Sequence, residues 1–276
     1  GATFYAYPSL AVNRFGDLLI GYSRFKSNEY ASAYAYYKPA SSQESASHWL
    51  VKAGEGPYFK TFDGDENRWG DYTSTLADPT NDIDFWTLQE YAAQAVGTGY
   101  TNGDGRWGTW WAKIAPAKST NDHFANAITL SGLLLTNTGL FIRPTKEAGE
   151  LNHLTNSTIA SIWFNWTAPA SGKVTLKASG DVLAPGVVVY TGSSVSSLTL
   201  LSDSFNGSGG DQAPSPPGTG PPLHSGFTTP AVVFNATNGV TYRIALVEFP
   251  ASVTTYTLVL NQPSPPLITA HPWPKQ

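Results

Sequence analysis

Four acidic residues lie close together in the first half of the chain, where they could bind a divalent cation. Three of them form the loop Asp63-Gly64-Asp65-Glu66, and Asp71 follows shortly after. Oxygen ligands at alternating positions suit a hard cation such as Ca²⁺. The spacing of an EF-hand loop, with its closing Glu, is absent, and a solvated turn uses the same residue types. The sequence therefore favours a solvated turn, with Ca²⁺ bound by Asp63, Asp65, Glu66 and Asp71 as the alternative.

A second set of acidic residues could supply the two carboxyl groups that glycoside hydrolysis requires at a defined separation. Asp71 and Asp78 can instead stabilise turns, because Asp side chains bond to nearby backbone N–H groups, and Arg68 can form a local ion pair. We expect these structural roles, because such residues taken singly carry little functional weight. The sequence also holds no Ser–His–Asp elbow, phosphate-binding loop or zinc motif. The set comprises Asp71, Asp78, Asp82, Asp84 and Glu90.

A third group, Glu147, Glu150 and His153, follows a three-residue spacing. Such a set could bind a metal ion. It contains a single His, however, and buried side chains of these types also satisfy one another by hydrogen bonding. We expect the structural role here.

Tryptophan is the other feature with a chemical use, because its large face can stack on a sugar ring or anchor another protein. In residues 106–114, strand alternation places Trp107 and Trp111 on one face and Trp110 on the other. We expect one face to join the core and the other to form an exposed binding or assembly surface. The candidate residues of this surface are Trp69, Trp107, Trp110, Trp111 and Trp273.

Short β-strands must position these side chains, because residues of alternating polarity are separated by Gly, Asn, Asp and Pro turns. The predicted fold class is all-β. A helix is predicted only around Leu88–Ala95, before Gly97 and Gly99. The first half contains two cycles of several strands, each of about 50 residues, which favours partial propeller-like sheets.

A shift in composition at residues 115–122 predicts a domain boundary, because Tyr becomes rarer and Thr, Val and Leu more frequent beyond it. About eight strands are then expected within roughly 140 residues, the size of a jelly-roll or β-sandwich domain. The predicted organisation is a propeller-like domain of about two blades over residues 1–118, a sandwich over residues 119–262, and a Pro-rich tail over residues 263–276.

Composition excludes several classes of protein. Charged residues make up 13% of the 276 residues, the net charge is -4, and Cys is absent. The absence of Cys rules out disulfides and thiolate metal sites, and the lack of basic clusters argues against binding to a nucleic-acid backbone. No apolar run approaches the ~18 residues of a membrane span. The chain starts with Gly, so we expect either a processed product or a segment of a longer precursor. The Ser/Thr/Asn-rich composition favours an extracellular or cell-surface location.

Two stretches of the first half resemble a known family. Residues 68–90 (RWGDYTSTLADPTNDIDFWTLQE) are similar to a blade of bacterial secreted β-propellers with sialidase-type, BNR-like repeats, and residues 7–22 (YPSLAVNRFGDLLIGY) to the preceding blade. The resemblance covers residues 1–115 and implies the C-terminal blades of such a propeller. Sialidase-type sites use a Tyr, a Glu, an Asp and three Arg from several blades, and two blades cannot surround a central substrate.

The second half resembles a secreted β-sandwich module of the pre-peptidase C-terminal (PPC) type, over nearly all of residues 119–262. Such modules are appended to secreted enzymes and surface proteins, so the resemblance implies a non-catalytic accessory role. Some relatives carry acidic loops that could hold calcium, and here Leu183-Ala184-Pro185 stands where they have Phe-Asp-Thr. The stretches that carry the resemblance are residues 121–132, 146–153, 161–174, 189–192 and 242–245.

An open pair of blades leaves sheet faces and strand edges unpaired, and such surfaces recruit other chains. The predicted function is therefore a secreted or cell-surface, non-catalytic structural or adhesive β protein that assembles with copies of itself or with a companion chain. The alternatives are the C-terminal fragment of a sialidase-like enzyme acting on glycans, and a carbohydrate-binding accessory module. No required cofactor, nucleic-acid partner or membrane span is expected.

Overall fold

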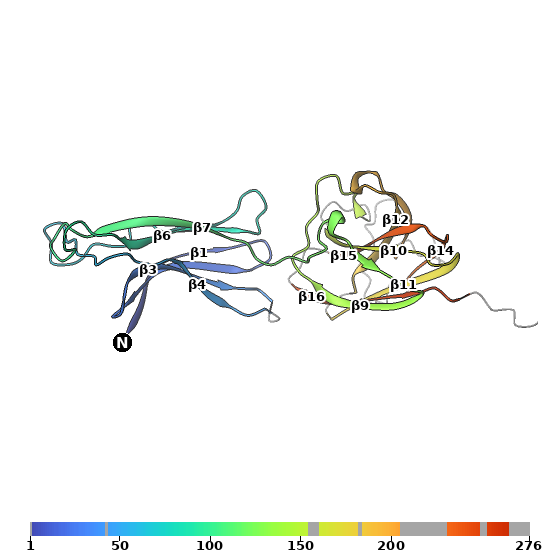
Figure 1. The fold of residues 1–276 in the computed structure, drawn as a ribbon, viewed down its shortest axis with the longest axis horizontal. Helices are drawn as coiled ribbons and strands as arrows, with labels where there is room; N and C mark the ends of the chain where they lie inside the picture. Colours follow the sequence, from blue (N-terminus) through green and yellow to red (C-terminus); the bar gives the residue numbers. More distant parts are fainter. Residues whose placement is uncertain are drawn as a thin grey trace, which may run out of the picture. The chain divides into compact units, whose positions relative to one another are not determined.

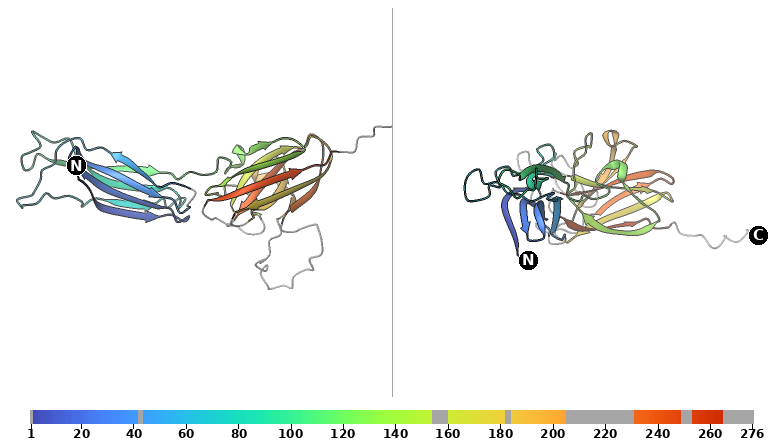
Figure 2. Two further views of the ribbon diagram at one scale, coloured as in Figure 1. Left: turned by 90° about the horizontal axis from the view of Figure 1, so that it is seen from below. Right: turned by 60° about the vertical axis from the view of Figure 1, so that its left-hand side comes forward.

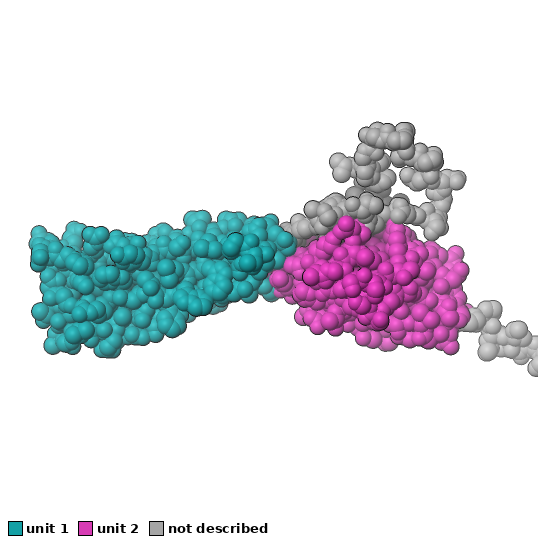
Figure 3. Space-filling view, turned by 90° about the horizontal axis from the view of Figure 1, so that it is seen from above, with its two compact units in different colours: residues 1–117 teal, residues 118–276 magenta. Residues whose placement is uncertain are grey.

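A computed structural model describes residues 2–41, 44–153, 160–181, 184–204, 231–248 and 253–264. The chain forms two compact units, residues 1–117 and residues 118–276 (Figure 3), which divide one residue before the predicted boundary. In the described part of the chain, no helix has the length and apolar character that a bilayer span demands. Trp273 and the predicted Pro-rich tail beyond residue 264 lie outside the described residues.

Unit 1 consists of two antiparallel sheets, each following the order of its strands in the sequence (Figure 1). β6 contacts both β2 and β3, and β1 contacts β5, so the sheets pack face to face. Their shared core contains Leu19, Ala35, Tyr37 and Phe85. The first sheet comprises β1 (Thr3–Val12), β2 (Leu18–Lys26), β3 (Glu29–Lys38) and β4 (Ser47–Lys52), and the second β5 (Ser74–Ala77), β6 (Phe85–Ala93) and β7 (Arg106–Ile114).

The turn between β1 and β2 contains the residue types that a tight turn requires. Asn13 Oδ1 accepts hydrogen bonds from the N–H groups of Phe15 and Asp17, both at 3.0 Å. Gly16 adopts a φ of 81°, which glycine reaches without steric cost. The Asn13 amide also donates to the carbonyl of Ile83 at 2.9 Å. Two apolar runs, residues 8–13 and 18–24, joined by a turn that contains Gly16 predict a hairpin here. The hairpin is present, and Asn13 ties its turn to the second sheet.

β1 is an edge strand with an irregular ladder. Its pairing with β2 shifts register between Ala6 and Ser9, and Tyr7 in this bulge has a φ of 55°. Pro8, which carries no backbone N–H, lies in the same interruption. A proline at an edge bulge costs no interior ladder bond.

The closest approach of the two sheets in unit 1 lies at Gly21. A Cβ at this position would be 2.0 Å from Gln89 Nε2 and 2.3 Å from Thr87 Oγ1. Both side chains are buried and bonded to one another at 2.9 Å. Glycine at position 21 therefore lets β2 and β6 pack.

The helix predicted around Leu88–Ala95 is wrong, because β6 continues through this stretch to Ala93 and pairs with β5 and β7. β4 and β9 (Leu134–Phe141) were not predicted as strands. Within the described part of unit 1, the two sheets form no closed propeller. Their assignment as blades of one stays a prediction.

Unit 2 is a sandwich of two sheets, shown from two further directions in Figure 2. Phe164 and Ile244 of one sheet and Leu176 and Leu258 of the other are fully buried in one core. The first sheet has the order β13-β12-β15-β10-β8 and the second β14-β11-β16-β9, so the all-β prediction is confirmed. The further strands are β8 (Ile128–Leu130), β10 (Ala160–Thr167), β11 (Gly172–Gly180), β12 (Gly186–Thr191), β13 (Thr199–Asp203), β14 (Ala231–Ala236), β15 (Thr241–Glu248) and β16 (Thr254–Asn261).

The other face of the five-stranded sheet carries a second, smaller core. Trp163 and Tyr190 are buried there, and Phe124 and Leu151 pack against them. Phe124 belongs to the short 3-10 helix η1 (Phe124–Asn126). Non-strand segments therefore cover this face, and they carry the acidic and histidine residues singled out in the sequence.

Candidate functional site

A cavity of about 350 Å³ lies in unit 1, where the segment between β4 and β5 meets β6 and β7. Five of its lining residues are aromatic and three are charged. A volume in this range is typical of small-molecule sites. The lining residues are Tyr58, Phe62, Arg68, Trp69, Gly70, Asp71, Tyr72, Glu90 and Trp107.

The aromatic rings of this cavity contact one another. Trp107 lies nearly parallel to Tyr72, with ring centroids 6.0 Å apart and an interplanar angle of 6°. Phe62 lies 6.4 Å from Trp107 at a tilt, and Tyr58 meets Trp69 edge-on at 4.9 Å. These are favourable geometries for aromatic pairs. The cavity thus has an aromatic wall assembled from separate parts of the chain.

Glu90 fixes the backbone of the cavity wall. Its Oε2 accepts a hydrogen bond from the Gly70 N–H at 2.8 Å, and its Oε1 accepts one from the Tyr72 N–H at 3.0 Å. Burial raises the pKa of Glu90 above its ordinary value, although these two bonds oppose the shift. Gly70 has a φ of 96°, and a Cβ there would lie 2.0 Å from a ring atom of Tyr7. Glu90 therefore acts as an anchor for the segment that carries Trp69 and Tyr72.

The four carboxylates considered for Ca²⁺ are not gathered into a binding group. In the described residues, no cluster of three or more His, Asp or Glu side chains could hold a metal ion. Asp63 lies in a turn with a φ of 66°, and Asp65 and Glu66 are exposed beside it. Asp71 instead pairs with Arg68, with Oδ2 3.0 Å from Nε. The local geometry is that of a solvated turn and a surface ion pair.

The carboxylates considered for glycoside hydrolysis also have structural partners. Asp78 Oδ1 accepts hydrogen bonds from the backbone N–H and the hydroxyl of Thr80, at 2.9 and 2.6 Å. The indole Nε1 of Trp86 donates to Asp78 Oδ2 at 3.0 Å. Asp84 lies 2.8 Å from Lys113 Nζ. Of the five carboxylates in this set, only Asp71 and Glu90 line the cavity.

Asp78 makes the acid stability of unit 1 depend on pH in a defined window. Hydrogen bonds from Thr80, then from Trp86, hold its pKa at about 2, below the ordinary 3.8. Its stabilising contribution is therefore present above pH 3.8 and is lost as the pH falls towards 2. In Asp78→Asn, the free energy of unfolding is expected to fall less between these pH values than in the wild type.

Urea unfolding at a series of pH values measures this difference, with the exposed Asp63→Asn as the matched control. Equal acid dependence of the wild type and Asp78→Asn would contradict the assignment.

The tryptophans of β7 do not divide into a core face and an exposed face as predicted. Trp110 is 45% exposed and Trp111 is 65% exposed, although they point to opposite faces. The reason is that β7 is an edge strand, so neither face is fully covered. Trp111 packs against Trp86 with centroids 5.3 Å apart, and the Lys52 ammonium lies 4.8 Å from the centre of Trp110.

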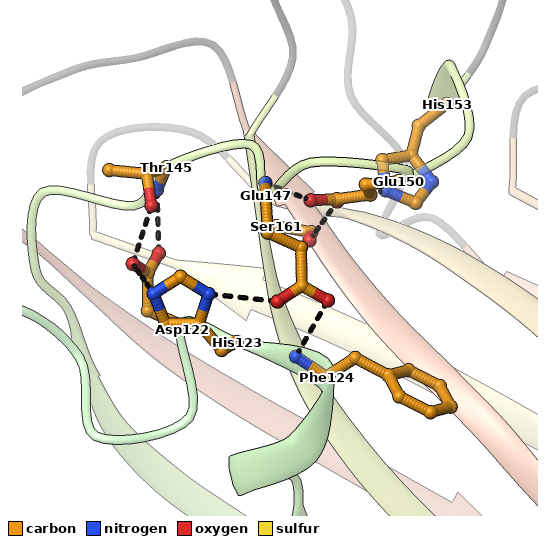
Figure 4. A network of polar contacts seen from close by, with 8 residues as sticks. All are labelled: Asp122, His123, Phe124, Thr145, Glu147, Glu150, His153 and Ser161. Atoms are coloured by element: carbon orange, nitrogen blue, oxygen red, sulfur yellow. Dashed lines mark hydrogen bonds and ion pairs between the residues drawn. The ribbon is translucent and has the colours of Figure 1, made fainter. Parts of the chain in front are cut away.

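Glu150 and His153 form the buried centre of the polar network in unit 2 (Figure 4). Their side chains are fully buried, with Glu150 Oε1 2.7 Å from His153 Nε2. The same carboxylate accepts a hydrogen bond from the Ser161 hydroxyl and another from the Glu147 N–H, the latter at 2.8 Å. His153 Nδ1 lies 2.7 Å from the Tyr190 hydroxyl. These contacts correspond to the structural hydrogen-bonding role expected for this group.

The outer part of this network joins the segment around η1 to the loop that follows β9. Asp122 accepts hydrogen bonds from the backbone N–H and the hydroxyl of Thr145, both at 2.6 Å. Glu147 Oε2 lies 2.8 Å from His123 Nδ1, and its Oε1 accepts the Phe124 N–H at 3.2 Å. Burial raises the pKa of Asp122 despite its bonds to Thr145. The network thus connects two covering segments to the sheet.

The network also lacks the arrangement of an activated serine. Ser161 donates to the Glu150 carboxylate, and His153 contacts Glu150 and Tyr190 instead of the serine hydroxyl. A Ser nucleophile requires access to substrate, and Ser161 is fully buried. Acyl transfer is therefore not supported at this position.

Of the tryptophans proposed as a binding surface, Trp69 and Trp107 meet at the cavity, whereas Trp110 and Trp111 do not line it. Tyr58, Phe62 and Tyr72 also line the cavity, although they were not among the residues expected at a binding surface. A signal for Tyr72 was present in RWGDY, where an aromatic residue closely follows Trp69. No protein-family description and no curated protein matches the chain.

Proposed function

We propose that this chain is a non-catalytic structural or adhesive β protein of the cell surface or extracellular space, which assembles with copies of itself or with a companion chain. The observation that supports it is the outer face of the first sheet, which faces away from β5–β7. Tyr5, Leu10, Val12 and Leu50 on this face are each more than half exposed. Large exposed apolar patches mark interaction surfaces.

Strand register places further apolar side chains on the same face. Leu10 is opposite Ile20, and Ile20 is opposite Tyr36. Tyr22 is opposite Tyr34, with their rings stacked at 6.0 Å. The outer face therefore carries aromatic and aliphatic side chains across β1, β2 and β3, among which Tyr22 and Tyr34 are buried by their neighbours and Arg24 lies over the Tyr34 ring.

The inner face of the same sheet combines small and large side chains. The row Ser9, Gly21 and Ala35 ends at Trp49, and the row Ala11 and Leu19 ends at Tyr37. An isolated sandwich gains most by burying its large apolar residues, because their burial removes more area from water. The large apolar side chains that stay exposed on the outer face therefore favour a second sheet packed there.

Catalysis is not part of the proposal, because the carboxylates that could perform it are bound by other groups. Glu90 accepts two backbone N–H groups, Asp78 accepts bonds from Thr80 and Trp86, and Asp84 pairs with Lys113. Each of these arrangements stabilises local structure.

Self-association is the test of this proposal. The wild-type chain is expected to show a mass that rises with concentration, and the double variant Leu10→Glu/Leu50→Glu to dissociate at least tenfold more readily, because two charges would be buried without partners. Sedimentation equilibrium over a hundredfold concentration range measures both.

Leu134→Glu is the matched control, since Leu134 is an exposed leucine of unit 2. It should associate as the wild type does. A wild-type chain that stays monomeric throughout would contradict self-assembly, and a companion chain captured equally well by wild type and double variant would contradict the role of this face.

A further inference from the structure

We propose that the aromatic cavity of unit 1 is a binding site for a neutral saccharide, with one sugar ring stacked on Tyr72, which is 52% exposed and packs with its other face on Trp107. This inference concerns a different part of unit 1 from the outer sheet face and does not depend on self-association. It assigns the cavity a class of ligand that combines an apolar ring face with hydroxyl groups.

The aromatic rings of the cavity match the apolar face of a sugar ring in shape and chemistry. Trp107 lies nearly parallel to Tyr72, with Phe62 tilted beside it. The face of an aromatic ring is electron-rich. The C–H bonds on one face of a pyranose ring are slightly positive and apolar, so they complement such a wall. Small-molecule sites are lined mainly by apolar groups, with a few polar groups that fix orientation.

The charge of the cavity favours a neutral ligand. Asp71 is paired with Arg68 at 3.0 Å, and the Glu90 carboxylate accepts two backbone N–H groups. The Lys60 ammonium lies 4.9 Å from the ring centres of both Phe62 and Trp107, so a cationic ligand would be repelled by it and by Arg68. An anionic ligand would be repelled by the carboxylates of Asp71 and Glu90. Because the charges of the two signs balance, an uncharged sugar is favoured.

The polar side chains of Arg68 and Asp71 lie where the hydroxyl groups of a sugar can reach them. The Arg68 and Asp71 side chains are 64% and 45% exposed, so they lie at the mouth of the cavity, where solvent still reaches them. The guanidinium offers hydrogen-bond donors and the carboxylate offers acceptors. A sugar hydroxyl can both donate and accept, so it can bond to either member of this ion pair without separating them.

The segment of residues 58–69 that lines the cavity is held in place by the chain's own hydrogen bonds, without a ligand. The Tyr58 hydroxyl donates to the carbonyl of Arg68 at 2.7 Å. The Lys60 N–H donates to Asn67 Oδ1 at 2.7 Å, and Trp69 Nε1 donates to Ser23 Oγ at 2.9 Å. A preformed site loses less conformational entropy on binding. The cavity can therefore bind a small ligand with few direct contacts.

The experiment uses the full chain with a panel of neutral sugars: methyl glucoside, methyl galactoside, methyl mannoside, cellobiose, lactose and N,N′-diacetylchitobiose. Choline chloride and sodium N-acetylneuraminate serve as cationic and anionic probes. Binding is followed by calorimetry and by Trp fluorescence. At least one neutral sugar is expected to bind and to change the fluorescence, whereas the two charged probes are not.

Trp107→Ala and Tyr72→Ala are expected to weaken that binding at least tenfold. Trp111→Ala is the matched control, because Trp111 is an exposed residue of the same strand that does not line the cavity, and its affinity should stay within twofold. Trp107→Phe retains an aromatic ring, so it should keep part of the affinity, which separates loss of stacking from loss of folding.

Three results would overturn the proposal. They are the absence of binding by every neutral sugar, binding that Trp107→Ala and Tyr72→Ala leave unchanged, and binding restricted to choline or N-acetylneuraminate. Each is independent of the sedimentation result for Leu10→Glu/Leu50→Glu, because those side chains do not line the cavity.

Discussion

Replacing Glu150 with alanine is expected to lower the free energy of unfolding by about 3–5 kcal/mol, because it leaves three hydrogen-bond donors without their acceptor, at about 1–3 kcal/mol each. Its carboxylate is fully buried and contacts His153, Ser161 and the Glu147 N–H. Alanine would leave these polar groups in a protein interior without their acceptor, and an unsatisfied buried polar group retains its full desolvation cost.

The largest part of this loss of stability comes from the buried N–H group of His153, which loses its acceptor. Burial raises the pKa of Tyr190, so its hydroxyl stays protonated and can donate to His153 Nδ1. Nε2 then carries the proton that is donated to Glu150. Without Glu150 this N–H has no acceptor from the network, and water must enter or the loop must move.

Urea unfolding of the full chain, monitored by circular dichroism, measures the loss. Glu147→Ala is the matched control, because its partner His123 is about half exposed, and such pairs contribute about 0–1 kcal/mol. Glu150→Gln retains an acceptor oxygen and should fall between the two. A loss below about 1 kcal/mol in Glu150→Ala would show that the network does not hold the covering segment.

Replacing Phe85 with alanine is the second change with a large expected effect, again about 3–5 kcal/mol. Phe85 is fully buried between the sheets of unit 1, and its ring meets Tyr37 edge-on at 6.4 Å. The core around it is small, with Leu19 and Ala35 as the other buried members. Leu19 and Tyr37 on the facing sheet are themselves buried, so they can move little to fill the cavity, and most of the lost contact area stays lost.

Thermal and urea unfolding measure this loss, with Leu76→Ala on the neighbouring strand as the control. Leu76 is 46% exposed, so its truncation should cost about 1 kcal/mol or less. Similar losses in the two variants would mean that Phe85 does not anchor the packing of the two sheets.

Local sequence signals predicted local structure well, as the β1–β2 turn shows. Asn13 and Gly16 act within a few residues of one another, through side-chain bonds to the backbone and a positive φ. The helix predicted around residues 88–95 failed because both faces of β6 are covered there. Gln89 is buried against the other sheet and Glu90 beneath residues 70–72. The sequence of β6 therefore lacks the simple alternation of apolar and polar residues by which a strand is recognised.

The candidate site was predicted only in parts. Trp69, Asp71 and Trp107 were each singled out, but nothing in their spacing shows that they surround one cavity. They meet because Glu90 binds the backbone at Gly70 and Tyr72, a contact across about 20 residues of sequence. Pairings of this kind depend on tertiary structure. The same limit applies to the outer sheet face, whose exposure depends on which side of the first sheet β5–β7 cover.

The bulge in β1 limits the kinds of assembly that this sheet can form. An exposed strand edge is a template on which further strands can add indefinitely, and fibres grow in this way. The register shift between Ala6 and Ser9, together with a proline that cannot donate, interrupts that template midway along the edge. The outer face of a sheet, in contrast, can pack against only one partner sheet, so association through this face stops after one step. The same chain can therefore expose an apolar surface and still form bounded oligomers instead of polymers.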